Sequence, residues 1–260
     1  MVCRPAGTVL ICVIVEFMTD PTPEAILVPE LYVGYPGVAF GGFVAGVLAE
    51  RSGAKTVRVD FRGPVPVGVP VRIAGTADGG CELGDAARPL ALAAPAELDL
   101  DAPAAPSWDE SVAAAEAFRA APPAGLVDCF GCGLDRTPDR GLRQHCTPVP
   151  GRNVVACDWT PDPALADPDG LLPPELVWGA LDCPGNWAGR LLGTQRQGAV
   201  TASLTATLLR PVAAAAPHIS YAWVLAESGR KHTLGVAVAT ADGELCAVAE
   251  ALWLDPRPAA

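Results

Sequence analysis

The sequence has few charged residues and no long hydrophobic run. Asp, Glu, Lys and Arg make up 18% of the 260 residues, against 50% for apolar residues. No stretch reaches the roughly 18 uninterrupted apolar residues of a membrane span, so we expect no membrane partner. The 18 basic residues are outnumbered by 29 acidic ones, which gives a net charge of −11. This excess argues against nucleic acid or an anionic membrane surface as the main partner.

Several enzyme motifs are also missing. The sequence contains no P-loop, no dinucleotide-binding glycine fingerprint and no serine nucleophile elbow. Its nine cysteines are an odd number in a chain of ordinary domain size, which is not typical of a secreted disulfide framework. We therefore expect a protein of the reducing cytoplasm.

The first 17 residues, "MVCRPAGTVLICVIVEF", differ in character from the remainder of the chain. Arg4 and the apolar run from Val9 to Val15 mimic a signal peptide, but no small-x-small cleavage site comes after them. Met18 then opens a stretch that resembles an ordinary start. We favour a start codon placed too early; a signal segment and an extra apolar strand stay open as alternatives.

The chain after Met18 divides into two similar halves. The 27 prolines and 27 glycines fall mostly between short apolar runs, a pattern typical of short strands joined by turns. Each half has one helical segment followed by a run of strands, which indicates an internal repeat. We expect an α+β protein with a first unit over residues 18–100, a linker over 101–140 and a second unit over 141–260. The linker should hold a short helix from Ser111 to Ala121 and a loop with a CxxC motif.

The strand pattern suggests how the halves combine. Residues 201–208 alternate between polar and apolar, as in a half-buried strand, and strand-like runs at 232–243 and 244–254 come next. A unit on its own would expose a long sheet edge. We therefore expect two antiparallel sheets joined into one continuous layer, with helices 42–52 and 174–190 packed antiparallel on its concave side.

An acidic residue interrupts the second helix in "VWGALDCPGNWAG", residues 177–189. A carboxylate at Asp182, on an otherwise apolar helix, is costly unless it is paired or faces a cavity. Burial would raise its pKa toward the range of a general base. Pro184 cannot donate to the carbonyl of Ala180, so the helix should kink or end just after Asp182, beside a pocket. The alternative is an Asp that only bonds locally at the break.

Three segments resemble those of hotdog-fold thioesterases. "AFGGFVAGVLAE", residues 39–50, resembles the His-Gly-Gly helix start of phenylacetate-pathway-type thioesterases, with Phe40 in place of the His. "VWGALDCPGNWA" is similar to the stretch that carries the catalytic acid in that family. "CFGCG…GLR", from Cys129 to Arg143, resembles the opening of the second unit in uncharacterised bacterial hotdog proteins.

The resemblance covers most of residues 25–255 and implies a double hotdog, in which each sheet wraps a central helix. It also implies a thioesterase that acts on an acyl-CoA or an acyl-carrier-protein substrate, and it leaves a homodimer open. Ser203 stands where type II acyl-CoA thioesterases would carry a catalytic Asp, so that mechanism does not transfer. Glu50 is expected to be a solvated helix end rather than a substitute acid.

The Gly-Gly helix start supplies the second part of the predicted site. A helix N-terminus presents unpaired N–H groups and a partial positive charge, and Gly41 and Gly42 let a ligand approach them. A thioester carbonyl placed there would be polarised, and its oxyanion stabilised. With Asp182 as general base or nucleophile, the predicted catalytic set is Asp182, Gly41 and Gly42. The alternative is that the glycines only permit tight packing.

The two repeats are unequal. Asp182 is the tenth residue counted from Pro173, and the tenth residue counted from Phe40 in the first repeat is Ala49. The second repeat starts with Pro173 and Pro174, which have no N–H to offer. Because hotdog thioesterases commonly build a site between two units, the resemblance implies one complete site out of two.

Other residues are expected to bind the substrate. They lie near the catalytic set in sequence or form a basic cluster suited to a CoA phosphate, and they are Phe40, Trp178, Cys183, Asn186, Trp187, Arg230, Lys231 and His232. For His218 and His232, which stand at strand starts, a solvated or structural role is favoured over such a contact. Cys129 and Cys132 form the CxxC motif, with His145, Cys146 and Cys157 downstream. Zinc needs four well-placed ligands, so an ordinary glycine turn that carries thiols is favoured over a zinc or redox site. We expect no metal and no cofactor.

Three functions stay open at this point. The first is hydrolysis of an acyl thioester, and the second is binding of an acyl thioester or hydrophobic small molecule without hydrolysis. The third is a dehydratase or another tailoring enzyme on an acyl carrier. A hydratase would carry a His-Asp pair at the first strand-helix junction, and Phe40 argues against this function.

Overall fold

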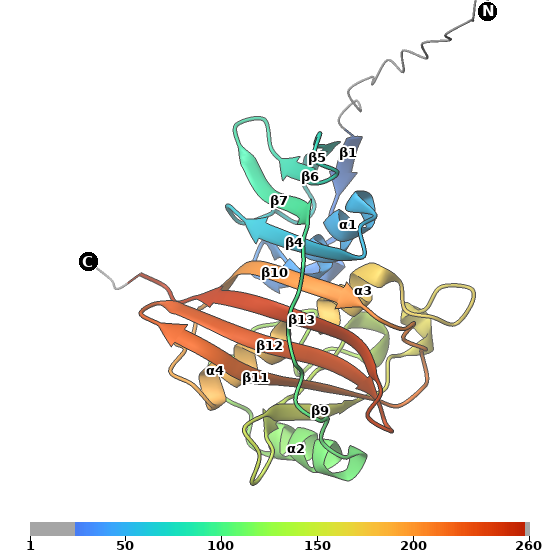
Figure 1. The fold of residues 1–260 in the computed structure, drawn as a ribbon, viewed down its shortest axis with the longest axis vertical. Helices are drawn as coiled ribbons and strands as arrows, with labels where there is room; N and C mark the ends of the chain where they lie inside the picture. Colours follow the sequence, from blue (N-terminus) through green and yellow to red (C-terminus); the bar gives the residue numbers. More distant parts are fainter. Residues whose placement is uncertain (1–23, 258–260) are drawn as a thin grey trace, which may run out of the picture.

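The computed structural model describes residues 24–257, so the expectations for residues 1–17 lie outside the described residues. Figure 1 shows the fold. The strands are β1 (Glu24–Leu27), β2 (Val33–Tyr35), β3 (Val38–Ala39), β4 (Thr56–Phe61), β5 (Pro70–Gly75), β6 (Cys81–Gly84), β7 (Pro89–Pro95), β8 (Thr147–Pro148), β9 (Val155–Trp159), β10 (Val200–Leu208), β11 (His218–Ser228), β12 (Lys231–Thr240) and β13 (Leu245–Leu254). The α-helices are α1 (Gly41–Ser52), α2 (Trp108–Ala120), α3 (Pro174–Ala180) and α4 (Cys183–Leu191). Short 3₁₀ turns lie at Glu30–Tyr32, Pro138–Arg140 and Pro163–Leu165.

Eleven strands form one antiparallel sheet in the order β1-β5-β6-β7-β4-β10-β13-β12-β11-β9-β8. Strands from the two halves of the chain meet at β4 and β10, where Val59 lies opposite Leu204. The continuous antiparallel layer predicted from the sequence is therefore present. A separate two-stranded sheet, β2-β3, leads directly into α1.

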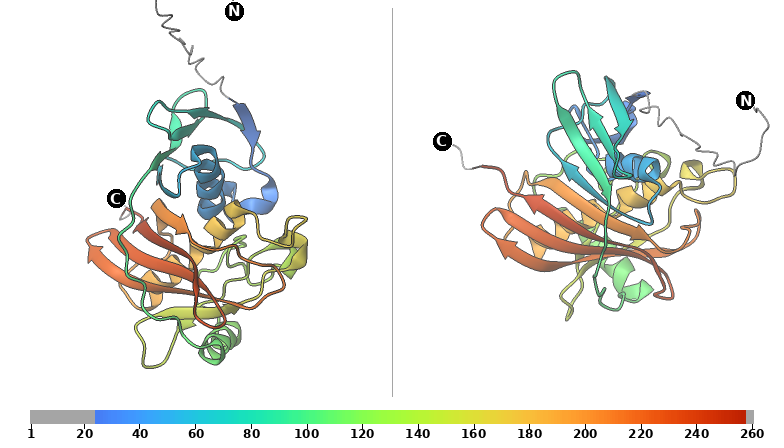
Figure 2. Two further views of the ribbon diagram at one scale, coloured as in Figure 1. Left: turned by 45° about the vertical axis from the view of Figure 1, so that its right-hand side comes forward. Right: turned by 45° about the horizontal axis from the view of Figure 1, so that its top comes forward.

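The helices α1 and α3 cross in an antiparallel arrangement. A side chain on Gly42 would meet Gly179, whereas one on Gly46 would meet Glu175, so the chain directions oppose each other. The α1 helix packs on β4, β6 and β7, and α4 packs on β11 and β12. Figure 2 shows the two arms of the sheet curving around these helices.

The segment over residues 174–190, predicted to be helical with a kink or end near Asp182, is two helices. The α3 helix ends at Ala180 and α4 begins at Cys183, with Asp182 in the break between them. Pro184 occupies the first turn of α4, where its missing N–H costs no intrahelical bond. The first helix thus ends two residues before Asp182 rather than just after it.

A long connection links the two halves on the other face of the sheet. From the end of β7 it runs across β13, β12 and β11 to α2, on the side opposite α4 (Figure 1). Its apolar residues Leu100 and Ala105 pack with Tyr221 and Trp223. The α2 helix starts three residues before the predicted Ser111, because Ser107 and Glu110 form a capping box.

In the part of the chain that the structure describes, no helix is both long and apolar enough to cross a bilayer.

Candidate functional site

A cavity of about 540 Å³ opens where the start of α1 meets the break between α3 and α4. Its walls are mostly apolar and come from both halves of the chain, including Tyr35, Phe61 and Trp253. A cavity of this size suits a small ligand or an acyl chain. The predicted residues Phe40, Gly41, Asp182, Cys183 and Asn186 all line it.

Asp182 joins the two halves at the wall of this cavity. Its side chain is 2% exposed. The backbone N–H of Gly42 donates to Oδ2 over 2.8 Å, and the hydroxyl of Thr201 donates to Oδ1 over 2.7 Å. The carboxyl group therefore contacts the N-terminal turn of α1 and the start of β10.

The position of Asp182 changes its acidity. Burial raises the pKa of this carboxyl to about 7, although the hydrogen bonds from Thr201 and Gly42 oppose the shift. A group with a pKa near neutrality can take and return a proton under physiological conditions. Asp182 is therefore a buried carboxyl group at the cavity whose pKa lies near neutrality.

The glycines at the start of α1 allow a very close approach. A Cβ on Gly42 would lie 2.8 Å from the Cα of Gly179 and 2.8 Å from the Cβ of Asp182. Tight packing is thus a real requirement at Gly42, in addition to its hydrogen bond. Among the described residues, the N–H of Gly41 has no hydrogen-bond acceptor, and Gly41 lines the cavity. This N–H is free to bind a carbonyl oxygen.

Three thiols also reach the cavity. Cys129 and Cys132 line it together with Cys183, and all three are buried. The sulfur atoms of Cys129 and Cys183 are 3.6 Å apart. Hydrogen bonds from Cys132 and Cys183 lower the pKa of the Cys129 thiol, and the same contacts with Cys129 raise the pKa of the other two thiols.

Comparison with known proteins identifies the fold. No protein-family model matches the sequence, and no curated protein matches it either. A conserved protein of unknown function with hotdog fold from Alicyclobacillus acidocaldarius matches 94% of this chain and 96% of its own, with 12% identity and a TM-score of 0.59. The chain has the hotdog fold.

Other hotdog neighbours are thioesterases that cover most of the chain. The TesB protein of Mycobacterium avium subs paratuberculosis matches 89% of this chain and 92% of its own, with 14% identity and a TM-score of 0.59. The acyl-CoA thioesterase II TesB2 of Mycobacterium marinum matches 85% of this chain and 91% of its own, with 16% identity and a TM-score of 0.54.

Several residues predicted to bind substrate lie elsewhere in this hotdog structure. Trp178 and Trp187 are buried and do not line the cavity. Arg230, Lys231 and His232 do not line it either. The Nε and Nη2 atoms of Arg230 donate to the backbone oxygen of Asp255.

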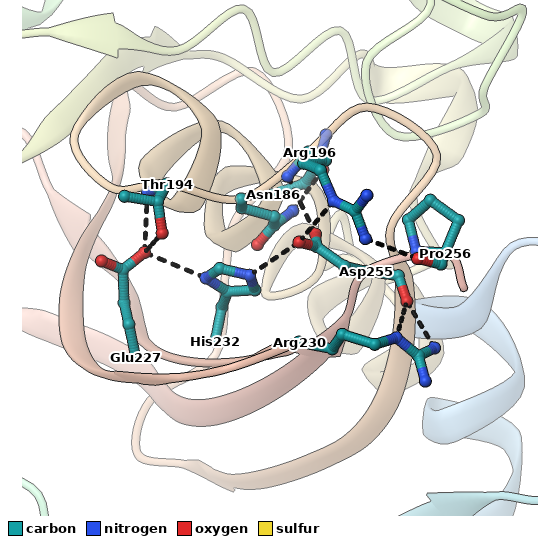
Figure 3. Close-up of polar contacts among 9 residues, drawn as sticks. Asn186, Thr194, Arg196, Glu227, Arg230, His232, Asp255 and Pro256 are labelled. Carbon is teal, nitrogen blue, oxygen red and sulfur yellow. Dashed lines mark hydrogen bonds and ion pairs between the residues drawn. The ribbon is translucent and has the colours of Figure 1, made fainter. Parts of the chain in front are cut away.

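His232 belongs to a buried polar network rather than to an exposed basic cluster (Figure 3). The side chain is 1% exposed and lies between Glu227, at 3.0 Å, and Asp255, at 3.3 Å. Arg196 binds the same carboxyl group of Asp255. This network attaches the end of β13 to the segment that follows α4, so it leaves His232 no freedom to meet a CoA phosphate.

Two parts of the cavity were missed in the sequence. Thr201 begins the predicted alternating strand, but nothing in that pattern indicated its bond with Asp182. The CxxC motif was recognised, yet Cys183 was not connected with it. Cys146 and Cys157, considered as its partners, instead contact each other as free thiols, with 3.3 Å between their sulfur atoms.

Arg62 is the single basic residue among those that line the cavity in the described structure.

Proposed function

We propose that the protein hydrolyses an acyl thioester, with Asp182 as the acid-base or nucleophilic group and the start of α1 as the oxyanion site. The observation that supports this most directly is the contact between Asp182 and the N-terminal turn of α1 inside an apolar cavity. The thioesterase neighbours have the same fold and support the same reaction class.

The fold suggests how the two halves of the chain combine to form the site. We interpret the eleven-stranded sheet and its two crossing helices as a double hotdog, with β4 and β10 as the junction between units. In this interpretation α1 is the helix of the first unit, and α3 with α4 is the interrupted helix of the second. The site then lies between units, with one helix giving the N–H donors and the other giving the acid.

The proposed reaction needs few groups. The thioester carbonyl oxygen accepts from the N–H of Gly41, where the positive end of the α1 dipole stabilises the oxyanion. Asp182 takes a proton from water, whose oxygen attacks the carbonyl carbon. The tetrahedral intermediate collapses, the C–S bond breaks, and the proton on Asp182 passes to the leaving thiolate. The products are a carboxylic acid and a free thiol.

Asp182 could instead attack the carbonyl carbon itself and form a mixed anhydride that water then cleaves. A single turnover in ¹⁸O-labelled water separates the two routes. Direct attack by water places the label in the acid product, whereas hydrolysis of the anhydride at the aspartyl carbon places it in the Asp182 peptide.

The cavity fits a hydrolase better than a hydratase. The described residues that line it include no histidine, and Phe40 stands at the strand-helix junction where a hydratase would need one.

The substrate is proposed to be an acyl-CoA or an acyl-carrier-protein thioester in the cytoplasm. Exposed Arg62 at the cavity is the basic group available to an anionic carrier.

The direct test is a panel of acyl-CoA thioesters with a thiol-detecting dye, applied to wild-type protein and to Asp182→Asn. Asn matches Asp in size but cannot take a proton from water, so the rate should fall by about 10²–10⁴-fold. Asp158→Asn is the matched control, because burial also raises the pKa of Asp158, yet this residue does not line the cavity. It should hydrolyse at the wild-type rate.

Two results would overturn the proposal. Equal rates for Asp182→Asn and the wild type would make Asp182 structural. Thermal stabilisation of the wild type by an acyl-CoA without thiol release would instead favour a protein that binds thioesters and does not hydrolyse them.

A further inference from the structure

Three cysteines from distant parts of the sequence converge at the cavity. Their sulfur atoms all lie within 4.8 Å of one another, and all three residues are buried. Cys129 and Cys132 come from the CxxC loop, and Cys183 begins α4. In a tetrahedral thiolate site with metal-sulfur bonds of about 2.3 Å, neighbouring sulfur atoms lie about 3.8 Å apart. The distance of 3.6 Å between Cys129 and Cys183 agrees with this spacing.

The loop around the cluster is shaped for close approach to sulfur. The N–H of Gly131 donates to the sulfur of Cys129 over 3.3 Å, which is the kind of bond that supports a thiolate ligand. A Cβ on Gly131 would lie 2.5 Å from the sulfur of Cys183 and 2.6 Å from the ring of Phe40. Glycine at this position is therefore needed for the CxxC loop to bring its thiols to Cys183.

A buried donor beside the cluster lacks a conventional partner. Within the described residues, the indole nitrogen of Trp187 is buried and has no hydrogen-bond partner that meets normal geometry. The indole is close enough to Cys132 to lower the pKa of that thiol, so it lies beside the cluster. A thiolate held by a metal would accept this N–H better than a neutral thiol does.

From this geometry we infer that Cys129, Cys132 and Cys183 bind one zinc ion, with the fourth coordination position facing the cavity. Three Zn–S bonds form, and the three thiol protons pass to the buffer. The fourth position is open to the cavity because all three residues line it, as in zinc sites that keep one position for water or another ligand. This inference replaces the sequence-based expectation of no metal.

Another thiol pair serves as an internal control. Cys146 and Cys157 are buried and their sulfur atoms are 3.3 Å apart, but neither lines the cavity. Burial and proximity of thiols are therefore common to both places, whereas the third thiol and the open position occur at the cavity alone.

The test is calorimetric titration of the fully reduced, chelator-treated whole chain with Zn²⁺. We expect one ion per chain, with proton release, and a loss of affinity of at least about 100-fold in Cys129→Ser, Cys132→Ser and Cys183→Ser. Cys146→Ser and Cys157→Ser should bind like the wild type. Wild-type protein that binds no Zn²⁺, or three cavity variants that bind it unchanged, would overturn the inference.

A second measurement needs no variant and so does not depend on how well the variants fold. X-ray absorption of the Zn²⁺-loaded wild type should show three sulfur ligands at about 2.3 Å. A first shell of nitrogen and oxygen alone would place the ion elsewhere and refute the site.

Discussion

The helices α1 and α3 contact each other closely at two places, near Gly42 and near Gly46, but the polar groups at these two places differ. At the start of α1, Gly42 packs on Gly179 and its N–H binds Asp182, beside the large cavity. Further along α1, Gly46 packs on Glu175 even more closely, since a Cβ on Gly46 would lie 2.4 Å from the Cα of Glu175. Close helix contact is therefore present twice, and the pairing of an N–H donor with a buried acid is present once.

The second end, where Gly46 meets Glu175, lacks the groups found at the first end. Ala49, the residue in the place of Asp182, is 7% exposed and offers no acid. Burial and the negative charge of Glu175 raise the pKa of Glu50. The two carboxylates repel each other, so Glu50 does not complement Glu175. The α3 helix starts with Pro174, and neither this residue nor Ala49 lines the cavity. The second end therefore has the close helix contact without the N–H donor and the buried acid of the first end.

The largest expected difference between the two ends is in the rate of hydrolysis, whereas the expected loss of stability is similar at both. Gly42→Ala and Gly46→Ala should each lower the free energy of unfolding by about 1–3 kcal/mol, because each added Cβ meets backbone of the other helix. Gly42→Ala should also displace Asp182 and reduce hydrolysis by about 10²-fold. Urea unfolding and rate measurements on folded protein report the two quantities.

Gly46→Ala is the matched control for this comparison, since it perturbs the same helix pair away from Asp182. It should keep most of the wild-type rate per folded molecule. Equal losses of rate in both variants would mean that the two ends contribute alike.

A smaller effect is expected at the hydroxyl that holds the other oxygen of Asp182. Thr201→Val removes that hydrogen bond at nearly constant shape, so hydrolysis should fall by about 10-fold, the equivalent of one bond of about 1.4 kcal/mol. Ser203→Ala, on the same strand, should stay close to the wild-type rate because Ser203 bonds Arg58 instead. Steady-state kinetics with one acyl-CoA would check both. A slower Ser203 variant with an unchanged Thr201 variant would contradict this assignment.

The smallest effect is expected at the rim of the cavity. Arg62→Ala should raise KM for an acyl-CoA by about threefold and leave kcat unchanged, because exposed charges contribute little to binding. Raising the salt concentration should erase the difference between variant and wild type. A variant in which kcat falls and KM stays constant would instead place Arg62 in the reaction itself.

The sequence was sufficient for the features that depend on local chemistry. The Gly-Gly start of α1 and the alternating strand β10 lie within one residue of their predicted starts. Pro184 predicts an interruption near Asp182 because proline cannot continue a helix. The repeated pattern of helix and strands also predicts the continuous antiparallel sheet.

Features that depend on long-range register could not be predicted. Thr201 reaches Asp182 only because of how β10 lies against the break between helices, which the alternation alone does not specify. Cys129 and Cys183 are 54 residues apart and meet through the packing of a loop on a helix. His232 looked like part of a basic loop, but its ring turns inward to Glu227, since a strand places neighbouring side chains on opposite faces.

The most direct test of the account is the number of acyl thioesters that one chain binds. Calorimetric titration with a thioether analogue of an acyl-CoA, which cannot be hydrolysed, should give one ligand per chain in wild-type protein. Gly41→Val should abolish that binding, because a branched side chain at Gly41 fills the cavity wall beside Asp182. A ratio near two, or full binding by Gly41→Val, would show that the difference between the two helix ends has no functional meaning.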